Sequence, residues 1–521
     1  MSVAAPAAPG WKNARILALV TALVVLGVAI ATITPDPIGV FVDDGIYLLI
    51  AKAIAAGEGY RYTFLPGAPA AIHYPPVFPL VLAAMLKISP TFPDNVVVLK
   101  FVNPVCFAFG AYGAVRLGTR VLRLNAAATA VVVVICALIA PVLMLTNALM
   151  SEPLFFALLV WSLIAIEDAV ARGGARRALV AGVLCALLTL VRTIGGVLVP
   201  AALLALWWRA RRTESAWLVL ASVLLVAPWQ LWVWSESRDF PVELRGSYGP
   251  YLEWLVDAYR REPAMAGHVI ERNLASLWHT LGFFFAPRLP SVLQGATAVA
   301  VMAAFACGLV AVWQRAASLT VFALLYGAVV LVWPYAPARF LGAVWPVVGL
   351  ILLASTQTLR AVDSRYKVRG ISVPVLVVAF LFIGHGAYAL RGLGNGWAGS
   401  AQRTMTGLLW PEVAWAARHA GTHDVVASDA NVMISLYTGL TAVPVSILTP
   451  AQYLTEKPVP EMAQELGALY ARYRPTLMLL VRDAPELDAI GEFARQANAP
   501  DVIRIGLIPG GGIAFALRER R

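Results

Sequence analysis

The sequence predicts an α-helical multi-pass membrane protein with about eleven transmembrane helices, followed by a small α/β domain. Of its 521 residues, 60% are hydrophobic and only 13% are charged, about half the charged share of an ordinary soluble protein. The mean hydropathy is +0.76. After residue 395 the long apolar runs stop, and short strand and helix patterns alternate. We therefore expect a transmembrane domain at 1–395 and an α/β domain at 396–521.

The predicted spans each have the length of about 20 apolar residues that a membrane-crossing helix needs. They lie near residues 14–33, 95–117, 125–147, 153–170, 177–192, 195–208, 214–235, 291–312, 317–335, 338–358 and 371–391. The first resembles a signal peptide, but no small-residue cleavage site precedes Pro35, so we interpret it as a helix. The run at 77–88 covers only about a dozen residues, so we expect it to lie in the interface or re-enter the membrane.

The arginines predict the orientation, because cytoplasmic loops of membrane proteins are rich in Arg and Lys. With the N-terminus inside, the predicted cytoplasmic loops contain Arg116, Arg120, Arg123, Arg172, Arg176, Arg177, Arg209, Arg211, Arg212, Arg315, Arg360, Arg365, Lys367 and Arg369. The first loop, the segment 236–290 and the C-terminal domain then lie outside. We expect a protein of the inner (plasma) membrane whose active site and C-terminal domain are extracytoplasmic.

Charge and cysteine content restrict the possible partners. The net charge of +11 comes largely from those loops, so we expect no nucleic-acid partner. The four cysteines all lie in apolar segments, without metal-type spacing. A disulfide framework is therefore excluded. We assign no metal and no cofactor, and a metal requirement stays open.

The C-terminal domain is expected to alternate strands and helices. Its strands are predicted at 425–428, 432–436, 476–481, 502–507 and 513–517, and its helices at 460–473 and 486–498. The glycines between 392 and 399 follow no strand, so we interpret them as a linker rather than a nucleotide loop. Residues 263–285 are expected to form an interfacial helix, which either holds a lipid chain or packs on the bundle.

The first loop, at 41–80, combines features that suggest chemistry. Its apolar spacing predicts a helix with one apolar face, and Asp43 and Tyr47, four residues apart, project together from another. Gly57 and Gly59 follow where that helix should end. Asp43 and Asp44 stand at its start, where negative charge is favourable. A helix cap needs only one of them, which leaves the other available for catalysis.

Further polar residues are predicted on this side of the membrane. His73 and Tyr74 lie in the same loop, in a His-Tyr-Pro-Pro sequence, and Glu152, Arg192 and Arg339 lie in later outer turns. Charges at the membrane boundary are costly and therefore tend to be functional. Each also has a structural alternative: His73 could hydrogen-bond a turn, Glu152 could cap a helix, and the arginines could reach the interface.

Several motifs, taken in order, resemble the GT-C superfamily of polyprenyl-phosphate-sugar-dependent glycosyltransferases, close to protein O-mannosyltransferases and lipid A aminoarabinose transferases. The motifs are DDGIY, GEGY, HYPPVFPLVLA, SEPLFFALL, VRTIGGVLVPA and ARFLGAVWPVV, and the resemblance covers about 10–395. It implies that Asp43 is the catalytic base, that Tyr47 matches a family tyrosine and that Glu152 is the acid of the second outer loop. Two positions depart from the family: Tyr74 replaces a phosphate-binding lysine, and Asp44 stands where Glu is common.

The residues fit this chemistry on their own terms. Transfer to an alcohol needs a carboxylate to accept the hydroxyl proton, and an ordinary Asp pKa near 4 leaves that group ionised. The leaving phosphate needs cations, which we predict to be Arg192 and Arg339. Asp44, Tyr47, His73, Tyr74 and Glu152 are predicted to help bind substrate.

We therefore expect an inverting membrane glycosyltransferase, transferring a hexose or a pentose. Its predicted partners are a polyprenyl-phosphate sugar, membrane lipids, and an acceptor that is a protein, a lipid or a cell-envelope polysaccharide. A transporter or flippase of lipid-linked sugars is the alternative, although such proteins usually show related halves and midplane polar residues. A structural subunit with a degenerate site also stays open.

Overall fold

The computed structural model describes residues 11–362, 367–368 and 371–520. The predicted loop residues Arg365 and Arg369 lie outside these ranges. By compactness the chain divides into two units: unit 1 contains residues 1–33, 100–228 and 270–399, and unit 2 contains 34–99, 229–269 and 400–521. Each unit is described separately.

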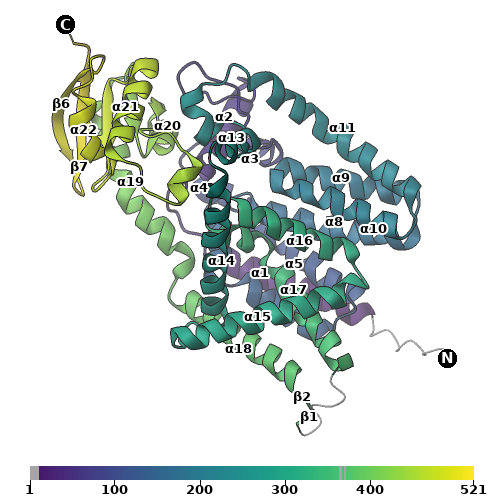
Figure 1. Cartoon of the computed structure of the whole chain (residues 1–521). Helices are drawn as coiled ribbons and strands as arrows, with labels where there is room; N and C mark the ends of the chain where they lie inside the picture. The colour runs from purple at the N-terminus through teal and green to yellow at the C-terminus, as the bar shows by residue number, and fades with distance from the viewer. Residues whose placement is uncertain (1–10, 363–366, 369–370, 521) are drawn as a thin grey trace. The chain divides into compact units, whose positions relative to one another are not determined.

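Unit 1 is a helical bundle (Figure 1). Its helices are α1 (Trp11–Ala31), α5 (Val102–Arg116), α6 (Ala126–Ala137), α7 (Ala140–Asn147), α8 (Glu152–Arg172), α9 (Ala175–Val191), α10 (Leu198–Trp208), α15 (Ser291–Trp313), α16 (Ala317–Val332), α17 (Pro337–Val362) and α18 (Val373–Gly394). Short turns η1 (Leu117–Val121), η2 (Thr193–Val197) and η4 (Trp397–Gly399) and the strand pair β1 (Lys367–Val368) and β2 (Ile371–Ser372) complete it. Helices α4 (Val96–Lys100), α11 (Arg212–Glu236) and α14 (Pro263–Phe285) contribute residues to both units.

Each predicted span falls on helix. In the part of the chain that the structure describes, seven helices are long and apolar enough to cross a membrane, or eight if α6 and α7 count as one bent span. The other predicted spans are shorter helices, at Ala175–Val191, Thr193–Trp208 and Ala317–Val332. The run at 77–88, predicted not to cross, is the twelve-residue helix α3 (Val77–Ile88). The protein is thus a multi-pass α-helical membrane protein.

The predicted span at 125–147 is a bent pair of helices, α6 and α7. The chain bends by 66° between α6 and α7. Ile139 is extended, and Pro141 follows within the first turn of α7. Proline cannot donate the backbone hydrogen bond that would continue α6, so the helix breaks just before it.

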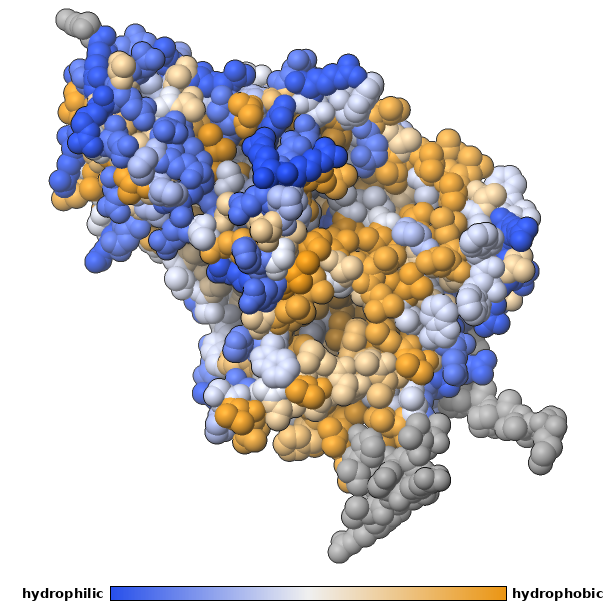
Figure 2. All heavy atoms as spheres, viewed as in Figure 1, coloured by the Kyte–Doolittle hydropathy of each residue, from blue (hydrophilic) through white to orange (hydrophobic). Residues whose placement is uncertain are grey.

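The outer surface of unit 1 is apolar. Helix α11 exposes Leu220, Val223 and Leu224, and α15 exposes Val292, Val299 and Val310. Figure 2 shows hydrophobic atoms spread widely over the bundle helices. Such a continuous apolar surface is far larger than soluble monomers expose, and it suits contact with lipid tails.

Unit 2 contains a five-stranded sheet in the order β4-β3-β5-β7-β6. Its strands are β3 (Val425–Ser428), β4 (Thr441–Val443), β5 (Leu477–Leu480), β6 (Asp501–Ile508) and β7 (Gly512–Arg518). Strand β3 is parallel to β4 and β5, whereas β7 is antiparallel to β5 and β6. The C-terminal helices are α19 (Ser400–His419), α20 (Asn431–Thr438), α21 (Val459–Tyr473) and α22 (Glu486–Phe493), with the turn η5 (Pro450–Tyr453).

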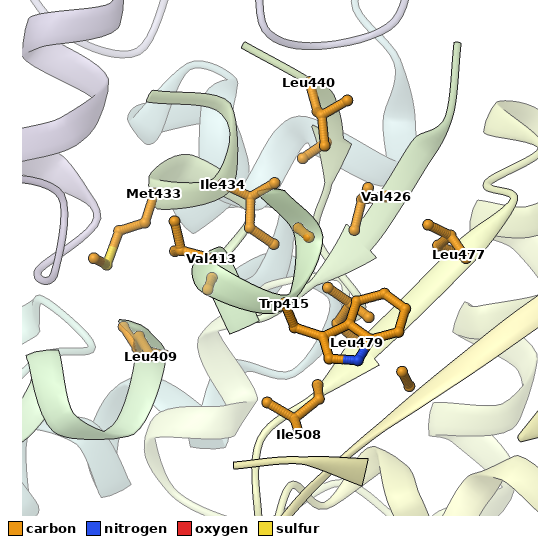
Figure 3. Close-up of a cluster of buried hydrophobic side chains, with 14 of the residues drawn as sticks. Leu409, Val413, Trp415, Val426, Met433, Ile434, Leu440, Leu477, Leu479 and Ile508 are labelled. Carbon is orange, nitrogen blue, oxygen red and sulfur yellow. The ribbon is translucent and has the colours of Figure 1, made fainter. Parts of the chain in front are cut away.

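A hydrophobic cluster joins this sheet to α19 and α20 (Figure 3). Trp415 of α19 lies among Val426, Leu479 and Ile508 of the strands, and Ile434 of α20 belongs to the same buried cluster. The predicted strands at 425–428, 476–481, 502–507 and 513–517 and the two predicted helices are confirmed, apart from their ends. The small α/β domain is therefore confirmed.

The predicted strand at 432–436 is wrong, because these residues lie in α20. A short continuous apolar run does not separate a strand from a buried helix by periodicity. Gly439, in the left-handed conformation at φ 75°, ends α20 and is the local signal for a helix. Helix α19 and strand β4 were not predicted.

The earlier segments of unit 2 carry the first loop. They contain α2 (Asp43–Ala56), α3, η3 (Val242–Leu244), α12 (Arg245–Tyr248) and α13 (Tyr251–Arg261). Helix α2 ends at Gly57 in the left-handed conformation, as predicted. Because unit 2 also includes 34–99 and 229–269, compactness does not reproduce a simple division at residue 395; the division into domains at 1–395 and 396–521 stays a prediction.

Candidate active site

The predicted site residues form two groups, one in each unit. Asp43, Asp44, Tyr47, His73 and Tyr74 belong to unit 2, and Glu152, Arg192 and Arg339 belong to unit 1.

Asp43 is the first residue of α2 and is half-buried. The residue before it, Val42, has φ 65° and ψ −62°, a conformation that a β-branched residue adopts only under strain. Such strain costs about 1–3 kcal/mol and persists where surrounding contacts enforce it. The turn at 39–42 therefore has to be held by its neighbours.

Asp44 holds this turn in place through hydrogen bonds. Its carboxylate is fully buried and accepts hydrogen bonds from the backbone N–H groups of Gly39 (2.8 Å) and Phe41 (3.1 Å). Burial raises the pKa of this carboxyl to about 7, although the two N–H groups oppose the shift. Asp44 thus ties the loop to α2, and its predicted contact with substrate stays a prediction.

Tyr74 binds the other aspartate. Its hydroxyl donates to Asp43 Oδ1 at 2.6 Å, and its ring packs edge-on against Tyr47 at 4.8 Å between centroids. Burial, and then the charge of Asp43, raises the pKa of Tyr74 well above its ordinary value, so the hydroxyl stays protonated. Tyr74 is therefore a neutral donor that orients the carboxylate of Asp43.

His73 is held in one tautomer. Its Nδ1 lies 2.6 Å from the carbonyl oxygen of Gly249, which can only accept, so we assign the proton to Nδ1 and a free lone pair to Nε2. Burial lowers the pKa of His73 to about 4, which keeps the ring neutral at pH 7. The ring also packs on Tyr251 at 3.7 Å between centroids.

The residues that hold His73 were not predicted. Tyr62 accepts from the backbone N–H of His73 (3.3 Å) and donates to the carbonyl of Tyr248 (3.2 Å). Together with Gly249 and Tyr251, these residues form a polar and aromatic frame around the His-Tyr-Pro-Pro turn. The sequence signal was the Tyr-Gly-Pro-Tyr stretch at 248–251, which lies in the segment 236–290, where we predicted only the helix at 263–285.

The C-terminal domain contacts the same loop. Tyr437 accepts from the backbone N–H of Ile38 (2.9 Å), and the Asn431 amide donates to the Tyr248 hydroxyl (2.8 Å). Helix α2 approaches α20 so closely that a Cβ at Gly45 would overlap the Val432 side chain. The tail therefore helps to position the loop that carries Asp43.

The second group, in unit 1, is centred on Glu152. Its Oε1 atom accepts from Arg192 Nη1 at 2.8 Å and from Arg339 Nε at 2.9 Å. The Glu152 side chain is 1% exposed, that of Arg192 14% and that of Arg339 34%. Arg192 also donates to Ser151 Oγ at 3.1 Å. Glu152 starts α8, but its carboxylate binds guanidinium groups rather than the helix N–H groups that a cap would bind.

This arrangement leaves an excess of positive charge. Two guanidinium groups share one carboxylate, so the group carries a net charge of +1. The buried carboxylate fixes both forks, which reduces the conformational entropy that they would lose on binding a ligand. Such a group is suited to an anion with several oxygens, such as a phosphate.

Replacing each aspartate by asparagine should separate their roles. We expect Asp44→Asn to lower the free energy of unfolding by about 1–3 kcal/mol. The two N–H groups bind different carboxylate oxygens, and asparagine replaces one of those oxygens by an NH2 donor. Asp43→Asn keeps an oxygen acceptor for Tyr74 and should cost less than about 1 kcal/mol. Denaturant unfolding in one detergent measures both, and equal losses would contradict this assignment.

The pH dependence provides a second readout of the same pair. The folded-state pKa of Asp44, about 7, lies above the ordinary value of 3.8, so its contribution is full below about pH 4 and declines as pH rises through 7. An asparagine at this position cannot ionise, so the Asp44→Asn variant should lack this decline. The same unfolding measurement, repeated across this pH range, checks it, and parallel pH profiles for the variant and the wild type would contradict it.

Among known proteins, only a comparison of structures finds matches to this chain. No family model and no curated protein sequence matches the chain. Among solved structures, ArnT from Cupriavidus metallidurans bound to undecaprenyl phosphate superposes with a TM-score of 0.54 at 13% identity, covering 98% of both chains. ArnT in the apo state gives a TM-score of 0.52 at 12% identity with the same coverage. The mycobacterial arabinofuranosyltransferase AftD gives 0.44 at 15% identity, with 42% of its own chain covered. The fold of this protein is therefore shared with ArnT over nearly the full length of both chains.

Proposed function

We propose that the protein is an inverting glycosyltransferase that moves a sugar from a polyprenyl-phosphate donor to an acceptor hydroxyl. This proposal rests on the different environments of two adjacent aspartates. The Asp44 carboxylate binds two backbone N–H groups of the loop, whereas Asp43 is half-buried and is oriented by the Tyr74 hydroxyl. The full-length likeness to ArnT, which is bound to undecaprenyl phosphate in its structure, supports the donor class.

The proposed reaction is a single displacement. The acceptor oxygen attacks the anomeric carbon from the face opposite the phosphate, Asp43 accepts the acceptor proton, and the bond from carbon to phosphate oxygen breaks. Configuration is inverted and polyprenyl phosphate leaves. General-base catalysis of this kind contributes about 10²–10⁴ in rate.

Arg192 and Arg339 are proposed to bind the donor phosphate. A phosphate diester carries one negative charge, and the released monoester carries nearly two. Guanidinium groups therefore bind the product-like transition state more strongly than the donor, which lowers the barrier. Glu152 would hold both arginines in register, acting as a positioning residue.

The reaction is proposed to take place on the outer face of the inner membrane. The lipid part of the donor stays in the bilayer, so the sugar must be reached at the membrane boundary. The loop arginines support an N-terminus inside, with the first loop and the tail outside. The acceptor is then a protein, lipid or polysaccharide of the cell envelope.

The donor class is tested with purified protein and a panel of radiolabelled polyprenyl-phosphate sugars. One donor should be consumed by the wild type, and Asp43→Asn should lower its turnover about 10²–10⁴-fold while donor binding changes little. Sugar translocation across liposomes without bond cleavage would instead favour a transporter. An Asp43→Asn protein with wild-type turnover would reject Asp43 as the base.

The phosphate contact is tested by Arg192→Lys and Arg339→Lys. Lysine keeps the charge but loses the fork, so each variant should lower turnover more than it weakens donor affinity, whereas alanine should reduce both. Arg288→Lys, at an exposed position of unit 1, is the matched control and should behave like wild type. Wild-type turnover in both test variants would leave the proposed phosphate contact without support.

The orientation is tested by labelling single cysteines placed at Thr213 and Thr422. Both threonines are exposed, so the substitution is conservative and the thiol can react. We expect a membrane-impermeant maleimide applied to intact cells or spheroplasts to label position 422 but not 213, because the flanking arginines predict that 213 is cytoplasmic. Labelling of both positions from outside would refute the proposed topology.

A further inference from the structure

A second charged group lies at the other end of unit 1. Helix α8 carries Glu152 at its start and Arg172 at its end, and its 21 residues span about 30 Å. At the Arg172 end, the turns at 171–177 and 208–214 lie side by side. The Gly174 N–H donates to Glu214 Oε1 at 2.8 Å, and Arg211 donates to the carbonyl of Ala171 at 3.4 Å. We name these two segments the arginine turns.

The arginine turns concentrate positive charge. They contain Arg172, Arg176, Arg177, Arg209, Arg211 and Arg212. Three carboxylates lie nearby, and each has structural partners. Asp168 pairs with Arg120 at 2.7 Å and with Arg172 at 3.9 Å. Glu214 binds the Gly174 N–H and pairs with Arg211 at 3.8 Å, and Glu167 accepts a hydrogen bond from Ser318. Arg176 and Arg212 are exposed, and no carboxylate among the described residues lies within ion-pair distance of either.

Each of these two arginines lines a groove. Arg176 and Arg177 line a groove of about 500 Å³ together with Asp168, Gly174 and Val180. Arg212 lies with Leu204, Trp207 and Trp208 on a groove of about 320 Å³. Trp207 is 65% exposed and Trp208 73% exposed. Tryptophan is typical of the boundary between lipid tails and headgroups, so the groove at Arg212 has the composition of a membrane interface.

The positive charge of the arginine turns favours anionic over zwitterionic lipid headgroups. A zwitterionic headgroup presents an ammonium group beyond its phosphate, and here that ammonium would meet further arginines, because Asp168, Glu214 and Glu167 already have partners. An anionic headgroup brings only negative charge. Figure 2 shows hydrophilic atoms beside hydrophobic ones at the end of the bundle where α8 to α11 meet in Figure 1, as a headgroup site requires.

We propose that the arginine turns bind an anionic phospholipid of the surrounding bilayer, in the leaflet remote from Glu152. Arg176 and Arg212 contact the phosphodiester, and Leu204, Trp207 and Trp208 contact the glycerol and upper acyl chain. Basic pockets between transmembrane helices bind acidic headgroups in this way, each cation near the surface contributing a substantial part of the affinity. Arginines that serve only to orient the chain would need no particular lipid.

The test measures lipid adducts of the purified full-length protein by native mass spectrometry, with phosphatidylglycerol or phosphatidylcholine added to the detergent. Wild type should retain phosphatidylglycerol preferentially. The double variant R176Q/R212Q should weaken that binding about tenfold to thirtyfold and leave phosphatidylcholine unchanged. The double variant R482Q/R504Q removes the same charge from exposed positions in the C-terminal domain and should bind like wild type.

A further pair, R176K/R212K, keeps the charge that orients the chain and should bind within about threefold of wild type. It keeps the experiment decisive if the glutamine variant fails to insert. Equal retention of both lipids by wild type, unchanged binding in R176Q/R212Q, or an equal loss in the R482Q/R504Q control would each overturn the proposal. Loss of lipid selectivity in R176K/R212K would do the same.

Discussion

A lipid bilayer offers no hydrogen-bond partners, and the structure of unit 1 depends on this constraint. Backbone groups that cross the membrane must bond within their own segment, which only a helix allows for a single chain segment. Charged side chains then collect at helix ends, as at Glu152 and Arg172 of α8. Those buried at the boundary must be paired, and Glu152 meets that requirement with two arginines. The constraint that makes unit 1 a helical bundle therefore also places its charged side chains at the two ends of the helices.

The adjacent aspartates show how environment assigns different roles to identical side chains. Asp44 is enclosed and accepts two backbone hydrogen bonds, so its carboxylate holds a strained turn. Asp43, one residue earlier, points toward the Tyr74 hydroxyl and remains half-buried. Helical geometry separates consecutive side chains by about 100°, which is why one faces the protein and the other does not. Within a single turn, one carboxylate thereby binds the backbone of the loop and the other binds a tyrosine hydroxyl.

The C-terminal domain is part of the support of the first loop. Tyr437, Asn431 and the close approach of α20 to Gly45 connect the tail to the segment that bears Asp43. The chain between 242 and 261 adds the carbonyl of Gly249 and the ring of Tyr251, which fix His73. Two segments far apart in sequence, the tail and residues 242–261, thus help to position the first loop, so substitutions in the tail can alter this loop from a distance.

The sequence by itself determined the features that depend on local periodicity. Apolar runs predicted the spans, paired glycines predicted the end of α2, and alternation predicted four of the five strands of the tail. It failed where local patterns were ambiguous, as in α20, or where one proline divided an otherwise continuous apolar run, as at α6 and α7.

Only the tertiary structure decided how the site residues pair. Tyr74 contacts Asp43 across 31 positions, Arg339 contacts Glu152 across 187, and Tyr62 contacts Tyr248 across 186. Burial and contacts between distant segments decided that Asp44, not Asp43, binds the backbone of the loop. They also decided that Arg192 and Arg339 share the Glu152 carboxylate. Local periodicity carries no information about such contacts, because they are fixed by how helices and loops pack.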